Sequence, residues 1–154
     1  MSEDVVYDYS YGIIPLRRTE EGDWSFLIVQ HVHGGHWGFP KGHADGAESP
    51  FDAALREFDE EVGLEPIRVF DLPPVQSRYQ FVGWSGDTID KTVAYFLAEV
   101  DETDVALDPA EIMAVRWVRL EELDELLPET KGSAELLRGL RAHLAKIATL
   151  EQEL

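Results

Sequence analysis

One segment fixes the place of a helix in this chain and gives that helix two unlike faces. Ser49 is a suitable N-cap, Pro50 suits the first helical position, and Gly63 suits the residue after the last turn. The spacing therefore predicts a helix from Pro50 to Val62. Its apolar side chains recur at about 100° per residue, so one face must pack against another layer of structure.

The opposite face of this helix is acidic. Glu57, Glu60 and Glu61 stand at i, i+3 and i+4 and project from the same side. The helix has no lysine to balance them, and like charges at this spacing destabilise a helix. A divalent cation is the simplest compensation, and oxygen-only ligands favour a hard ion such as magnesium, manganese or calcium. The alternative is an acidic face that lies in solvent.

Composition and charge limit the class of protein. A chain of 154 residues suits one domain over residues 1–154. A formal net charge of −18 argues against duplex nucleic acid and membrane partners, since both are polyanions. The chain has no cysteine, which excludes disulfides, thiolate zinc sites and cysteine nucleophiles. With no signal-peptide pattern and no apolar stretch of membrane-spanning length, we expect a cytoplasmic location. The oligomeric state stays open.

The rest of the chain predicts a layered mixture of strands and helices. Strand patterns precede and follow the acidic helix, and two more helices end the chain. The first two strands flank a turn at 20–23 and suggest a hairpin. This order predicts a mixed α/β or α+β sandwich. The expected strands are 5–16, 24–32, 37–39, 68–72, 75–82, 92–100 and 114–118, and the expected later helices are 120–127 and 134–150.

The acidic helix and the loop before it carry a recognisable motif. Gly42 is followed after five residues by Glu48 and after seven more by REFDEEVGL, from Arg56 to Leu64. This spacing fills every fixed position of the Nudix box, so the chain resembles the Nudix family. The resemblance implies an α/β/α sandwich with a central mixed β-sheet. It also implies a divalent-metal hydrolase that cleaves nucleoside diphosphates linked to another moiety.

The resemblance also implies roles for the box residues. Glu57 and Glu61 are the expected metal ligands, and Glu60 is either a ligand or the base that deprotonates water. Mg²⁺ is the expected cofactor, with Mn²⁺ as a possible substitute. Positive charge there would stabilise the negative charge that develops when a phosphoanhydride is cleaved.

Two further box residues are expected to shape the site. Arg56 is placed to pair with Glu60 or with Glu48, and so to hold a catalytic carboxylate in one rotamer. Gly42 is expected among the metal-site residues. Gly42 and Gly63 are also expected to give the backbone freedom where the chain enters and leaves the helix.

Two segments outside the box resemble signatures of asymmetric dinucleoside tetraphosphate hydrolases within this family. Residues 36–43, HWGFPKGH, resemble HW-x-x-PKGH, and residues 91–99, KTVAYFLAE, resemble a K-T-V-x-Y-W/F-LAE strand. His36, His43, Lys41 and Lys91 are therefore candidate substrate ligands, of which His36 and the two lysines would hold phosphates. The alternatives are solvated lysines and a histidine packed in a turn. The loop departs from the usual pattern, with Gly46-Ala47 in place of Pro-Gly.

A late glutamate and an aromatic side chain complete the expected site. Glu111 resembles the glutamate that hydrolases of this group use as metal ligand or base, with a solvated carboxylate as the alternative. Adenine recognition should use an aromatic face. Tyr79 is the first choice, and Phe81 or Trp84 are the alternatives.

These resemblances imply a metal-dependent hydrolase that splits diadenosine tetraphosphate into ATP and AMP, with Glu60 or Glu111 activating water. A second interpretation keeps the chemistry with another substrate, namely a diphosphoinositol polyphosphate, a nucleoside triphosphate or capped RNA. A third is a Nudix module that senses a nucleotide without cleaving it.

Overall fold

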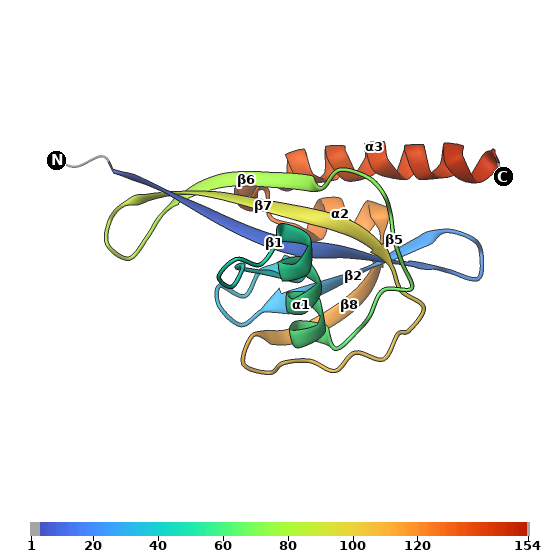
Figure 1. The fold of residues 1–154 in the computed structure, drawn as a ribbon, viewed down its shortest axis with the longest axis horizontal. Helices are drawn as coiled ribbons and strands as arrows, with labels where there is room; N and C mark the ends of the chain where they lie inside the picture. The colour runs from blue at the N-terminus through green and yellow to red at the C-terminus, as the bar shows by residue number, and fades with distance from the viewer. Residues whose placement is uncertain (1–3, 154) are drawn as a thin grey trace.

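The computed structural model describes residues 4–153, which form one mixed β-sheet with helices on both faces (Figure 1). The strand order is β3-β2-β1-β7-β5, with β4 paired to β1, β6 to β7 and β8 to β2. The strands are β1 (Val5–Arg18), β2 (Trp24–His31), β3 (Trp37–Gly38), β4 (Lys41–Gly42), β5 (Arg68–Val69), β6 (Val75–Val82), β7 (Thr88–Glu99) and β8 (Ile112–Arg119). The helices are α1 (Pro50–Val62), α2 (Leu120–Leu126), α3 (Ser133–Gln152) and the short 3₁₀ helix η1 (Glu129–Lys131).

Most predicted elements are present, and the differences are local. The bounds of α1 and β6 are as predicted, and β1 and β2 form the expected antiparallel hairpin. Strand β7 begins at Thr88 rather than at residue 92, and β5 ends at Val69 rather than at residue 72. Neither β4 nor η1 was predicted, because elements of two or three residues carry no periodic signal.

The long strand β1 lies at the centre of the sheet and separates two hydrophobic cores. Ile14 and Leu16 pack with residues of α2 and α3 on one face. Ile13 packs with Phe58 and Val62 of α1 on the other. Alternating side chains of one strand therefore hold helices on opposite faces, which confirms the predicted α/β/α sandwich.

Parallel pairing with β7 continues along β1 from Val5 opposite Thr88 to Leu16 opposite Glu99. At their outer ends β1, β6 and β7 run together beyond the helices, to the left in Figure 1.

None of the helices between residues 4 and 153 combines the length and apolar composition needed to cross a membrane.

A close approach of two backbones fixes the short strand β4 against β1. Gly12 pairs with Lys41, and a Cβ on Gly12 would overlap the Pro40 carbonyl oxygen and lie 2.9 Å from a Tyr95 ring carbon. We therefore expect Gly12→Ala to displace this segment and to lower the free energy of unfolding by roughly 1–3 kcal/mol. Urea denaturation measures this loss.

Gly46→Asn is the control for this prediction. Gly46 has φ +56° with no atom near its Cβ position, and asparagine tolerates this left-handed conformation. Equal unfolding midpoints for the two variants would contradict the steric explanation.

Candidate active site

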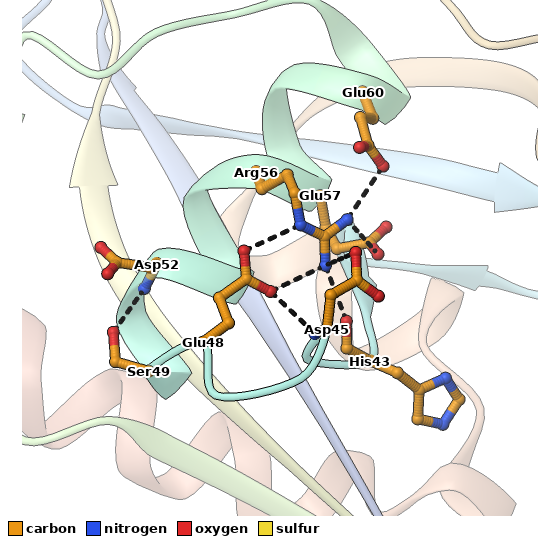
Figure 2. Close-up of polar contacts among 8 residues, drawn as sticks. All are labelled: His43, Asp45, Glu48, Ser49, Asp52, Arg56, Glu57 and Glu60. Atoms are coloured by element: carbon orange, nitrogen blue, oxygen red, sulfur yellow. Dashed lines mark hydrogen bonds and ion pairs between the residues drawn. The ribbon is translucent and has the colours of Figure 1, made fainter.

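Helix α1 begins and ends where its capping residues place it. Ser49 Oγ accepts a hydrogen bond of 3.1 Å from the Asp52 N–H (Figure 2). Gly63 adopts φ 67° and ψ 26°, and its N–H donates to the Asp59 carbonyl at 2.9 Å. Both caps are the predicted ones. The rotation of the acidic face relative to the sheet is set by the opposite face, where Ala54, Phe58 and Val62 pack in the core.

The acidic face of α1 borders a cavity of about 440 Å³, within the size range of small-molecule sites. Lysines and histidines from β2, β4, β7 and the connecting loops line its other walls. The fold thus brings together nine predicted site residues: Glu57, Glu60, Glu61, Glu111, Gly42, Lys41, Lys91, His36 and His43. Tyr79 and Arg56 lie outside this cavity.

Arg56 connects the loop before α1 to two glutamates of the helix (Figure 2). Its guanidinium donates to both carboxylate oxygens of Glu48 at 2.9 and 3.0 Å, and to the His43 carbonyl at 2.8 Å. It also donates to Glu57 and to Glu60, each at 3.1 Å. Arg56 therefore binds both predicted partners, Glu48 and Glu60, at once. Hydrogen bonding, above all to Glu48, raises the pKa of Arg56.

Glu61 is the side chain that most needs a cation. It is only 4% exposed, and its Oε2 is buried without a hydrogen-bond partner. Burial, followed by the charge of Glu57, raises its pKa to about 8. A hard cation would offset both effects, because it favours the charged carboxylate and supplies the missing partner.

The donor set fits a hard cation in chemistry, although the side chains are not gathered around one point. Within residues 4–153, no three His, Asp or Glu side chains are placed to hold a metal ion as they stand. Arg56 binds one oxygen of each of two of these carboxylates, Oε1 of Glu57 and Oε2 of Glu60. The second oxygen of each is not used by the guanidinium, and a carboxylate can accept from both sides.

The structure explains the glycine at position 42 by space rather than by the backbone freedom that the sequence suggested. It is not among the residues with positive φ, so backbone freedom does not explain it. Instead, the Glu57 carboxyl group lies where a Cβ on Gly42 would be. The absence of a side chain at this position lets Glu57 rest against β4 at the edge of the cavity.

Lys91 is buried in the cavity wall with partners that the sequence did not reveal. Its ammonium donates to Asp8 Oδ2 at 2.6 Å and to Ser10 Oγ at 2.5 Å. Asp8 also contacts His43 Nε2 at 2.9 Å. Burial tends to raise the pKa of Asp8, but its bonds to Lys91 and His43 lower the value overall. The lysine is thus fixed in position by β1, its parallel neighbour.

Two neighbouring histidines with tilted rings line both the cavity and a second, smaller pocket. The rings of His31 and His36 lie 4.8 Å apart. Burial, with the nearby charges of Lys41 and Lys131, lowers their pKa values to about 3 and about 4. His36 is therefore neutral near pH 7, so it can donate a hydrogen bond to a phosphate but brings no charge. His31 was missed because a histidine at a strand end carries no signal of its own.

The smaller pocket is aromatic and has a volume of about 30 Å³, room for no more than a few waters. Tyr79 lines it together with His36, whereas Phe81 and Trp84 do not. Lys131 also lines it, with its ammonium 5.1 Å from the Tyr79 ring centroid. Sequence reasoning missed Lys131, which reaches the pocket from η1.

Comparison with known proteins identifies the family. The model of the NUDIX domain matches residues 6–140. The chain belongs to the Nudix family. The fold, the acidic helix and the cavity are all consistent with a Nudix hydrolase. Members of this family generally use divalent metal ions.

Two relatives and one solved structure illustrate the similarity. Asymmetrical bis(5'-nucleosyl)-tetraphosphatase of Sus scrofa is 37% identical to this chain, and the match covers 74% of this chain and 77% of the relative. An RNA pyrophosphohydrolase of Cereibacter sphaeroides is 31% identical, and the match covers 71% of this chain and 76% of the relative. Among solved structures, a binary complex of the C. elegans Ap4A hydrolase has a TM-score of 0.71 and 28% identity, covering 90% of this chain and 98% of that one.

The raised pKa of Glu61 makes stability depend on pH when no metal is bound. Its folded-state pKa is about 8 against an ordinary value of 4.5, so between these values the unfolded chain has already lost the proton that the folded protein keeps. Stability contributed by this group therefore falls as pH rises from about 4.5 to about 8, by up to about 1.4 kcal/mol per pH unit.

Glu61→Gln should remove this contribution. With EDTA present, urea denaturation should show the variant gaining stability relative to the wild type as pH rises from 5 to 8. Parallel pH profiles for the two proteins would mean that Glu61 has an ordinary pKa.

Proposed function

We propose that this Nudix hydrolase splits diadenosine tetraphosphate into ATP and AMP with bound Mg²⁺. The observation that carries the proposal is one cavity in which Glu57, Glu61 and Glu111 face Lys41 and Lys91. Carboxylates suit hard cations, and lysines suit the phosphates that those cations leave uncompensated. The names of the tetraphosphatase relatives support the same substrate.

Glu57 and Glu61 would hold the metal, with Glu60 or Glu111 as a further ligand. Bound Mg²⁺, or Mn²⁺ in its place, would neutralise charge on the phosphate oxygens. Gly42 leaves the space in which the Glu57 carboxylate lies. Arg56 orients the ligands, since it binds Glu57 and also the loop carboxylate Glu48.

The reaction needs a base, and two glutamates are candidates. Glu60, with its side chain 54% exposed, and Glu111 both border the cavity. Either would accept a proton from water as its oxygen bonds to phosphorus, while the bond from phosphorus to the leaving nucleotide oxygen breaks. Protonation of the departing phosphate by solvent completes the balance.

The remaining walls of the cavity suit the phosphate chain, and the smaller pocket beside it suits the adenine ring. Lys41 and Lys91 supply positive charge, and His43, which contacts Asp8, borders the same space. Neutral His36 can donate a hydrogen bond. Tyr79 offers an aromatic face for adenine beside His36, once the small pocket opens. The partner is therefore a small nucleotide, and a cytoplasmic location stays a prediction.

Other substrates of the family remain alternatives with distinct products. The RNA pyrophosphohydrolase relative favours an RNA 5' end, whereas the net charge of −18 disfavours a long polyanion. A diphosphoinositol polyphosphate or a nucleoside triphosphate would use the same carboxylates, and a sensing module would bind without turnover. Chromatography of products from a substrate panel, with and without EDTA, separates these cases: equimolar ATP and AMP supports the proposal.

We expect Glu57→Gln and Glu60→Gln each to lower kcat by orders of magnitude with little change in unfolding midpoint, since both groups are partly exposed and serve the reaction. Steady-state kinetics with magnesium and diadenosine tetraphosphate measures the loss. Asp59→Asn is the matched control, because Asp59 lies exposed on the same helix and does not border the cavity. Near-wild-type turnover in both glutamine variants would refute the mechanism.

A further inference from the structure

The outer ends of three strands extend past Tyr79 and Lys91, beyond which the proposed reaction uses no residue of these strands. We call residues 5–9 of β1, 79–82 of β6 and 88–92 of β7 the strand arm; it projects beyond α1 and α3 (Figure 1). Side chains of directly paired residues share a face of a sheet. The pairings of Tyr79 and of Asp8 with Lys91 therefore place one face of the arm in line with the cavity wall.

The next row outward on this face is apolar. Phe81 pairs with Ile89, which pairs in turn with Val6. Phe81 is 42% exposed and Val6 43% exposed, and neither borders the cavity or the aromatic pocket. An open apolar row thus begins where the polar wall of Lys91 and Tyr79 ends.

Two aromatic rings and a lysine lie together beside this apolar row. The rings of Tyr79 and Phe81 lie 6.0 Å apart at 29°, in a stacked arrangement. The Lys131 ammonium is 5.1 Å from one centroid and 5.4 Å from the other. In the part of the chain that the structure describes, Lys131 makes no ion pair, although the chain has 31 acidic residues. A lysine kept over rings and away from carboxylates is available to an anion.

A planar ring joined to phosphates is the ligand that matches both features. Its ring would continue the stack on the exposed Phe81, and its phosphates would pass Lys131 on the way to Lys91 and the cavity. Base–aromatic stacking of this kind needs no specific hydrogen bond. The pocket beside Tyr79 offers only about 30 Å³, so a second base needs a surface outside this pocket.

We propose that Phe81, with Val6, Ile89 and Lys131, forms a subsite for the second nucleoside of a dinucleoside polyphosphate. This inference rests on the proposed function, which supplies a substrate with two nucleosides. It makes the strand arm the part of the protein that distinguishes a dinucleotide from a mononucleotide with the same number of phosphates.

The test compares Phe81→Ala with wild type on diadenosine tetraphosphate and on adenosine 5'-tetraphosphate, both with magnesium. The second compound lacks the second nucleoside. We expect KM for the dinucleotide to rise about tenfold, the lower range of the effect of removing one base stack, with KM for the mononucleotide unchanged. Phe81→Trp should keep the wild-type KM, because it keeps a stacking face.

Val82→Ala is the matched control, since Val82 is the next residue, is 73% exposed and points to the opposite face of the arm. If Phe81→Ala does not fold, Phe81→Leu keeps apolar bulk without an aromatic face and should show the same selective rise. An equal rise in KM for both substrates would overturn the proposal by placing Phe81 at the first base. An unchanged KM for the dinucleotide would also overturn it.

Failure of the proposed function has a different signature. In that case the wild type releases no ATP and AMP from the dinucleotide. Calorimetric titration with the same two compounds then tests the subsite alone: tighter binding of the dinucleotide that Phe81→Ala abolishes supports it. Equal binding of both compounds by wild type overturns it.

Discussion

The hydrogen bonds of one guanidinium hold the acidic site together. Arg56 joins Glu48 and the His43 carbonyl, in the loop, to Glu57 and Glu60 on the helix. Without it, carboxylates one turn apart would repel one another and the loop would lose its tie to α1. Each of these two bonds uses one carboxylate oxygen, Oε1 of Glu57 or Oε2 of Glu60. The guanidinium therefore orients both side chains while the second oxygen of each stays unused by Arg56.

A second group of charges is fixed by the sheet rather than by the helix. Lys91 is 5% exposed and is held by Asp8 and Ser10 on the parallel strand. The ion pair with Asp8 and the hydrogen bond to Ser10 offset the cost of burying this charged group in the cavity wall. Substrate phosphates would then meet a positive charge whose side chain is already ordered, which lowers the entropic cost of binding.

The sequence was informative wherever a site depends on local spacing. Ser49, Gly63 and the glutamates of α1 are neighbours along the chain, so caps and helical periodicity predicted both the helix and its acidic face. Contacts between distant segments carry no such pattern. Asp8 reaches Lys91 only because β1 and β7 pair in parallel, and Lys131 reaches Tyr79 only because η1 lies over β6. These partners required the fold.

The distribution of lysine reconciles an acidic chain with an anionic substrate. The chain has four lysines, and three of them, Lys41, Lys91 and Lys131, border the cavity or the aromatic pocket. With a net charge of −18, the protein as a whole repels polyphosphates, and salt screens that repulsion beyond roughly 10 Å. Short-range cations then decide binding. For the short polyphosphate proposed above, these three lysines and a bound metal would supply the positive charge that the acidic remainder of the surface lacks.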